Sequence, residues 1–174
     1  ASDVYKRQES GGNILISQAN ALATAGTLMP EFKNAEKWME TGYQILSEEV
    51  QNQIMSDGWH KEMSLHYHIG IVADFYEAMK LAEANQLSSK LPSNFTEPLR
   101  KAAEVVMHFT YPNYFSKGSD NVVPMFNDSW SRTRNVLKNT NFKQYVEMFP
   151  DSEELKYMQT AGNGGTPQGH TPNN

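Results

Sequence analysis

Residues 57–70, DGWHKEMSLHYHIG, hold three histidines, a glutamate, a tyrosine and a tryptophan within fourteen positions. Imidazole, phenol and carboxyl groups bind metals and transfer protons, and the same residue types also occur at the starts of helices. The segment therefore allows three interpretations: a metal site, a site of proton chemistry, or a helix start that happens to be rich in histidine.

A metal site is the least favoured of the three. His66 and His68 are two residues apart, which on a helix points them about 200° away from each other. The pairs that share a helix face are Glu62 with His66 and Ser64 with His68. The chain has no His-Glu-x-x-His pattern, no second ligand cluster and no cysteine. We expect neither a metal nor another cofactor.

The other two interpretations share one local structure. Ser64 is placed to cap a helix whose first turn carries His66, Tyr67 and His68. In the structural interpretation these side chains are half buried and hydrogen-bonded. In the catalytic one, Tyr67 and a histidine transfer protons while Glu62 orients one of them. The segment by itself does not choose between them.

The elements that position these residues are predicted to be helices almost throughout. Apolar residues recur at spacings of three and four along most of the chain, which is the helical period. Residues 112–130 are irregular but rich in apolar and aromatic side chains, so we expect an ordered loop that lines a site. One short candidate strand falls at 121–123. The predicted helices cover residues 13–29, 32–54, 64–85, 96–111, 131–149 and 151–160.

The fold prediction is therefore all-α, in sequential helical hairpins. The same periodicity selects the residues that should be buried between the helices. These predicted core residues are Leu15, Ala19, Leu22, Trp38, Leu46, Ile69, Val72, Tyr76, Val105 and Phe109.

Composition excludes some classes of partner. The 174 residues are 39% hydrophobic, enough for one domain with a core, and their net charge is −5. A negative chain without a lysine and arginine run is not typical of nucleic-acid binding. No stretch approaches the roughly 20 apolar residues of a membrane span. We expect neither nucleic acid nor membrane as a partner.

The two ends differ from the rest of the chain. Residues 1–8, ASDVYKRQ, resemble the translation of a sequencing adaptor, a scar common in metagenomic fragments; the alternative is a natural polar strand. If residues 1–8 are such a scar, the native sequence begins near Glu9. Residues 161–174 are rich in glycine, proline and asparagine, which indicates a linker or a disordered tail.

Three blocks of sequence resemble, in order, those of heparinase II/III-type polysaccharide lyases. They are residues 13–42, which join a helix of small residues to a Pro-Glu-Phe-Lys turn, residues 56–68, SDGWHKEMSLHYH, and residues 123–130, VPMFNDSW. The resemblance covers residues 9–160. Leu65 stands where the family often has proline, Asn127 where it often has glycine, and His66 where an apolar residue is commoner, so His66 is expected to be peripheral. Ile14 replaces the histidine of related alginate lyases, which disfavours alginate.

The resemblance implies a fold and a location. Residues 9–160 would form an incomplete (α/α) toroid of helical hairpins. Residues 161–174 would be the linker to a missing C-terminal β-sandwich domain, which in this family usually holds the general-base histidine. The family also implies a periplasmic location.

The resemblance also implies a reaction, the β-elimination of an acidic polysaccharide that contains uronic acid, similar to heparan sulfate. By motif, Asn13 would neutralise the uronate carboxylate and Tyr67 would protonate the leaving oxygen. Without the resemblance, Asn13 would be interpreted as a helix N-cap, and the alternative function is a non-catalytic carbohydrate-binding or structural helical domain. The residues expected to contact the sugar or support the site are Glu62, His68, Asn127, Asp128 and Trp130; His60 and His108 are expected to be structural or exposed.

The adaptor interpretation predicts that residues 1–8 contribute nothing to folding. Deleting them should change the free energy of unfolding by less than about 1 kcal/mol. Urea unfolding of the full chain and of the chain without residues 1–8 measures this change. A larger loss of free energy of unfolding would show that residues 1–8 belong to the domain.

Overall fold

The computed structural model describes residues 11–116 and 120–165, and this part of the chain is helical. The predicted scar at 1–8 and residues 166–174 of the predicted linker lie outside the described residues. Within the described ranges, strand-type pairing is limited to an isolated bridge between Ile54 and His60. The all-α prediction is confirmed, while the candidate strand at 121–123 is wrong. The α-helices are α1 (Asn13–Leu28), α2 (Ala35–Gln53), α3 (Leu65–Ala84), α4 (Glu97–His108), α5 (Arg134–Val136), α6 (Phe142–Met148) and α7 (Glu153–Gln159).

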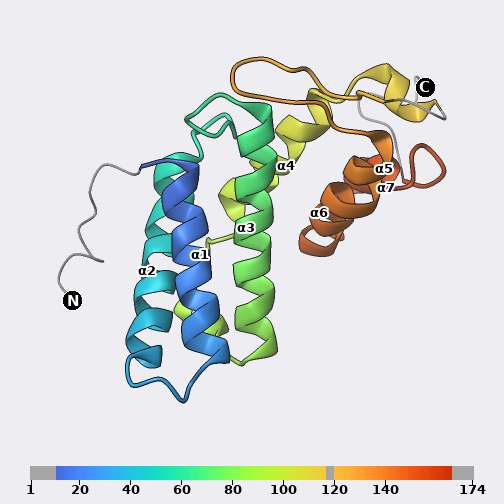
Figure 1. Ribbon diagram of the computed structural model, residues 1–174. Coiled ribbons are helices and arrows are strands. Elements are labelled where there is room, and N and C mark those ends of the chain that lie inside the picture. Colours follow the sequence, from blue (N-terminus) through green and yellow to red (C-terminus); the bar gives the residue numbers. More distant parts are fainter. Residues whose placement is uncertain (1–10, 117–119, 166–174) are drawn as a thin grey trace.

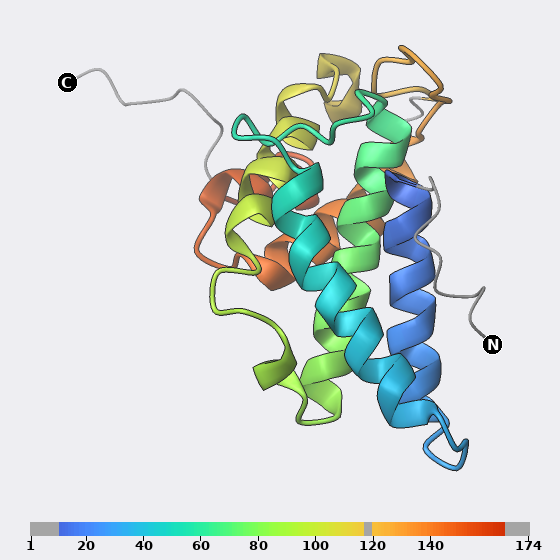
Figure 2. The same cartoon turned by 90° about the vertical axis from the view of Figure 1, so that its left-hand side faces the viewer.

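Three long helices form the main layer. α1 and α2 are an antiparallel hairpin, and α3 runs beside α1 in the same direction (Figures 1 and 2). α4 returns along the layer, and α6 and α7 pack beyond α3 (Figure 1). Short helical turns interrupt the connections, namely η2 (Ser88–Lys90), η3 (Pro112–Phe115) and the π-helical turn η4 (Leu137–Asn141), which joins α5 to α6 where the sequence predicts one helix. The starts of α1 and α3 and the end of α2 therefore meet at one end of the molecule.

Small residues set the spacing between α1 and α2. Ala19 and Ala23 on α1 face Gly42 on α2, and a methyl group on Gly42 would lie 2.5 Å from the Ala23 nitrogen. Because real side chains do not approach a backbone atom so closely, the two helices must separate if Gly42 gains a side chain. The run of small residues in α1 thus explains why this hairpin is tight.

The core prediction holds for half of its members. Ala19, Leu46, Ile69, Val72 and Val105 are buried. The remaining residues are half-buried, apart from Phe109, which is 38% exposed and contradicts the prediction. Phe109 follows the last turn of α4 and packs against the edge of Trp59 at the surface, with 4.8 Å between ring centroids. The half-buried residues are Leu15, Leu22, Trp38 and Tyr76.

The first residues of the predicted linker, 161–165, pack against the end of the domain. Ala161 is 9% exposed, and its N–H donates to the Met158 carbonyl at 3.0 Å. Ala161 and Gly162 both adopt positive φ angles, 52° and 89°, which reverse the chain after α7. Residues 161–165 therefore fold back on α7, contrary to the expectation of an unpacked segment.

A buried set of hydrogen bonds ties the loop before α3 to three helices. Gln53 Nε2 donates to the Gly12 carbonyl at 3.0 Å, and Gln53 Oε1 lies 2.9 Å from His60 Nε2. The His60 backbone N–H donates to His68 Nδ1 at 3.1 Å, while His68 Nε2 donates to the Ala102 carbonyl at 2.8 Å. Since Nδ1 accepts and a carbonyl can only accept, His68 is neutral with its proton on Nε2.

Burial opposes the charging of both histidines. It lowers the pKa of His60 to about 4, helped by the charge of Lys61. It also lowers the pKa of His68 to about 4, although the bond to the Ala102 carbonyl acts in the opposite direction. In the unfolded chain both would titrate near 6.5. Because the unfolded chain binds more protons between these values, this contribution to stability is complete above about pH 6.5 and is lost toward pH 4.

We predict that lowering the pH from 7 to 5 reduces the free energy of unfolding by about 2 kcal/mol for each of the two histidines. Urea unfolding followed by circular dichroism at several pH values measures this slope. His108→Gln, a change at an exposed histidine of α4, should keep the slope. If the free energy of unfolding does not change between pH 7 and 5, His60 and His68 are not buried, neutral histidines with lowered pKa values.

The close approach of α1 and α2 gives a second stability prediction. Gly42→Ala should lower the free energy of unfolding by about 2 kcal/mol or more, because the added methyl meets backbone atoms. Gly70→Ala is the matched control on α3, where a methyl would meet nothing within 4 Å. It should stabilise the chain by roughly 0.5–1 kcal/mol through helix propensity. Equal effects of the two changes would refute the packing argument.

Candidate active site

A small hollow of about 190 Å³ lies at the end where α1 and α3 begin. Its walls come from the first two turns of α1 and the first three turns of α3, and both helix N-termini, with their partial positive charge, lie at this end. The residues that line the hollow are Asn13, Ser17, His66, Tyr67, Gly70, Ile71 and Asp74. The two residues expected to carry the chemistry, Asn13 and Tyr67, are therefore brought together.

Asn13 does not cap its own helix. It is the first residue of α1, and the N-cap position belongs to Gly12, with a φ of 77°. The backbone N–H of Asn13 donates to Glu62 Oε1 at 2.8 Å, so a glutamate from the loop before α3 takes the place of a capping side chain. A side chain at Gly12 would collide with that carboxylate, since a Cβ would lie 1.8 Å from Oε1. The N-cap interpretation of Asn13 is wrong, and its amide is left to line the hollow.

Tyr67 is held by a residue far along the chain. Its hydroxyl donates to Asp128 Oδ2 at 2.5 Å. The hydrogen bond to Asp128 is the main reason that the pKa of Tyr67 is raised above its usual value of 10.0, followed by partial burial and the charges of Asp128 and Glu62. The phenol is therefore protonated at neutral pH, which is the state a proton donor requires.

Ser64 joins the loop of residues 123–133 to the start of α3. Its Oγ accepts from the Tyr67 N–H at 3.5 Å, as the sequence predicts for a cap. The same hydroxyl donates to the Asp128 carbonyl at 2.8 Å and lies 2.9 Å from Ser129 Oγ. Ser129 Oγ in turn accepts from the backbone N–H of His66 at 3.3 Å. The loop is thus ordered, as expected, and is fixed directly to the turn that carries Tyr67.

The backbone of Asn127 adopts a conformation that suits the glycine expected at this position from the family resemblance. It has a φ of 55°, in the left-handed region that glycine adopts freely and asparagine tolerates. Its side-chain amide donates to the Met63 carbonyl at 2.5 Å, which ties the loop to the segment before Ser64. Asn127 therefore shapes the loop that presents Asp128.

His66 is not peripheral, contrary to the expectation from the family pattern. It lines the hollow and stacks on Trp130, with 3.6 Å between ring centroids. Arg132 Nη2 lies 3.5 Å from His66 Nδ1. Burial, and then the charge of Arg132, lower the pKa of His66, although Asp128 opposes them. Trp130 is 56% exposed, so much of its side chain remains accessible to solvent.

The floor of the hollow contains a pair that the sequence analysis missed. Ser17 Oγ donates to Asp74 Oδ2 at 2.6 Å. Burial raises the pKa of Asp74, and the hydrogen bonds from Ser17 and Asn20 act against that rise. Asp74 lies two helical turns beyond Tyr67, so following the helix face on from Tyr67 would have found it.

His68 lies away from the hollow. It is completely buried, and both of its ring nitrogens bond to backbone atoms of other segments. Its ring also meets the edge of Trp59, with 5.4 Å between centroids. His68 therefore supports the loop before α3, together with the equally buried His60. For these two histidines the structural interpretation is the right one.

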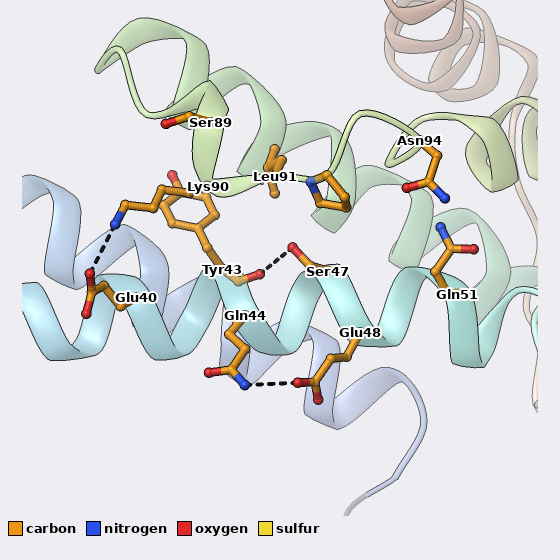
Figure 3. Close-up of a pocket in the computed structure, with 11 residues that line it drawn as sticks. Glu40, Tyr43, Gln44, Ser47, Glu48, Gln51, Ser89, Lys90, Leu91 and Asn94 are labelled. Carbon is orange, nitrogen blue, oxygen red and sulfur yellow. Dashed lines mark hydrogen bonds and ion pairs between the residues drawn. The ribbon is translucent and has the colours of Figure 1, made fainter.

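Another hollow, of about 730 Å³, lies elsewhere, between α2 and residues 89–94 (Figure 3). Its polar side chains bond to one another: Lys90 pairs with Glu40 at 3.0 Å, and Gln44 donates to Glu48 at 3.0 Å. No group of three histidine, aspartate or glutamate side chains in the described ranges could hold a metal ion. A helix long and apolar enough to cross a membrane is also absent from the part of the chain that the structure describes.

Known proteins resemble this chain in both sequence and structure. A family described as Heparinase II/III N-terminus matches residues 2–157. A heparin-sulfate lyase of Bacteroides thetaiotaomicron is 96% identical over 166 residues, which are 95% of this chain and 24% of that protein. A heparin-sulfate lyase of Bacteroides stercoris is 28% identical over 163 residues, 93% of this chain and 23% of that protein.

Solved structures give the same result. The crystal structure of a heparinase III matches with a TM-score of 0.88 and 96% identity, over 95% of this chain and 25% of that one. A heparan sulfate lyase from Pedobacter heparinus matches with a TM-score of 0.72 and 27% identity, over 93% of this chain and 24% of that one. This chain thus spans about a quarter of the length of these relatives. Its helices form part of the (α/α) toroid expected from the sequence, and because the family match includes residues 2–157, the chain belongs to the heparinase II/III N-terminus family.

Proposed function

We propose that this chain is part of a polysaccharide lyase that cleaves a uronic-acid-containing glycan, similar to heparan sulfate, by β-elimination. The observation that carries the proposal is the convergence of Asn13 and Tyr67 on one hollow. The names of the relatives, heparin-sulfate lyases, agree with this substrate class.

The reaction sets two requirements that Asn13 and Tyr67 meet. The proton on C5 of a uronate is poorly acidic while the neighbouring carboxylate is ionised, so that carboxylate must be neutralised. The Asn13 amide, which is free of any capping role, would donate to it and stabilise the enolate-like intermediate. Tyr67 would then give its proton to O4 as the C4–O4 bond breaks.

The base is proposed to come from outside this toroid segment. In the family it is usually a histidine of a β-sandwich domain, so the acid and the carboxylate neutraliser would belong to one domain and the base to the other. His170 lies outside the described residues. A periplasmic location, which the family also implies, is part of the same proposal.

A non-catalytic carbohydrate-binding or structural domain is the second candidate. Such a domain could use the exposed face of Trp130 to bind a sugar. It would not need a capping glutamate that frees Asn13, nor a tyrosine held protonated beside it. The arrangement of Asn13 and Tyr67 therefore favours the lyase.

The test uses a full-length chain that contains these 174 residues. Tyr67→Phe keeps the ring and removes the transferable proton, so elimination on heparan sulfate should fall by about 10² or more while the fold survives. In Asn13→Ala the rate of elimination should fall by a comparable factor, because the uronate carboxylate is no longer neutralised. Unsaturated products absorb in the near ultraviolet, which gives the rate directly.

His108→Ala, at an exposed position of α4, is the control and should keep the wild-type rate. The isolated 174 residues should show little or no turnover, since the base is missing. Near-normal activity in Tyr67→Phe would discard the proposed role of this tyrosine and favour the binding-domain alternative.

A further inference from the structure

We propose that Asp128 is a positioning residue that keeps the hydroxyl proton on Tyr67, so that Tyr67 serves as the acid of the elimination and not as its base. This inference rests on the proposed function, because it assigns a role within the same site.

The contact between the two side chains is the first support. The Tyr67 hydroxyl donates to Asp128 Oδ2 at 2.5 Å, a length typical of a hydrogen bond to a charged acceptor. An ionised Asp128 can only accept, so the proton of this bond belongs to the phenol. Ionising Tyr67 would place two negative oxygens at hydrogen-bond distance, which is unfavourable.

The position of Asp128 does not depend on Tyr67. Its backbone carbonyl accepts from Ser64 Oγ at 2.8 Å, and the neighbouring Ser129 hydroxyl also bonds to Ser64. On the other side, Asn127 holds a left-handed φ of 55° and donates to the Met63 carbonyl. The loop therefore fixes the carboxylate through its own anchors and presents it to the phenol.

The other charges around Tyr67 act in the same direction. Glu62 approaches from the loop before α3, and its charge adds to that of Asp128 in raising the pKa of Tyr67. Asp74 lines the same hollow from α3, and burial raises its own pKa. The neighbouring cation is Arg132, which is directed at His66 Nδ1. The two charges that act most on the phenol are therefore those of Asp128 and Glu62, and both favour its neutral form.

This arrangement separates the two proton transfers of the elimination. A tyrosine that took the C5 proton would have to begin as a phenolate, and Asp128 opposes that state. As the acid, Tyr67 loses its O–H bond, O4 gains the proton, and the electron pair of the C4–O4 bond goes to the leaving oxygen. An alkoxide is a stronger base than a phenolate, so donation remains favourable. The C5 proton goes to a different residue, and the electron pair of the C5–H bond forms the C4=C5 double bond. Solvent then returns a proton to Tyr67.

The chain offers a matched control on the same helix. Tyr76, also on α3, donates to the carboxylate of Glu147 on α6, well away from the hollow. Glu147→Gln therefore replaces the charged acceptor of a tyrosine hydroxyl by a neutral one, as Asp128→Asn does, at two residues that do not line the hollow.

The experiment measures kcat and KM against pH on heparan sulfate, with full-length wild-type enzyme, Asp128→Asn, Asp128→Glu and Glu147→Gln. In Asp128→Asn the alkaline limb of kcat should move to lower pH than in wild type, toward the ordinary tyrosine pKa of about 10. Near neutral pH the phenol stays protonated in this variant, so kcat should fall only because the hydroxyl is less well oriented, by up to about tenfold and with KM almost unchanged. Asp128→Glu restores the charge and should return the limb toward wild type, while Glu147→Gln should leave the profile unchanged.

An alkaline limb that stays in place in Asp128→Asn, with Tyr67→Phe inactive, would overturn the role of Asp128 and leave the proposed function standing. A loss of activity in Asp128→Asn that only parallels a loss of melting temperature would overturn that role as well. Activity in Tyr67→Phe would instead overturn the proposed function. Should Asp128→Asn fail to fold, Asp128→Glu and Asp128→Ser decide the matter, since only the former should keep the wild-type limb.

Discussion

The buried hydrogen bonds from Gln53 through His60 to His68 are the constraint on which the site depends. They connect the residue before α1, the end of α2, the loop before α3 and the middle of α4. These bonds pair buried polar groups of different segments, so a shift of one segment leaves a polar atom of another unpaired in the interior. The loop before α3 has little regular structure, and these bonds hold it in one position.

Helix spacing supplies the second constraint. The small residues of α1 let α2 pack closely on one side, and α3 runs parallel to α1 on the other (Figure 1). Parallel neighbours begin at the same end, so the first turns of α1 and α3 face a common space. Asn13 and Tyr67 occupy those first turns. The hollow is thus a consequence of two helices starting side by side.

The capping of these two helices separates structural from chemical tasks. Glu62 accepts the N–H at the start of α1, and Ser64 caps α3. Because other residues satisfy these backbone groups, the side chains of Asn13 and Tyr67 are free to face the hollow. Ser64 also anchors the loop that carries Asp128, so one hydroxyl aligns the phenol with its carboxylate partner.

The sequence by itself determined the helical class, the cap at Ser64, the ordered loop near residue 128 and, through its resemblance to a family, the pairing of Asn13 with Tyr67. These features depend on local periodicity, on short-range capping and on motifs written along the chain. Tertiary structure alone decided which histidine lines the hollow. His66 and His68 are two residues apart, and packing turned His68 inward and left His66 beside Trp130. The tertiary structure also placed Ser17 against Asp74, put Glu62 at the start of α1 and left Phe109 at the surface. Each of these outcomes depends on the rotation of one helix against another, which is set by contacts between residues far apart in sequence and so is not contained in the period of any single segment.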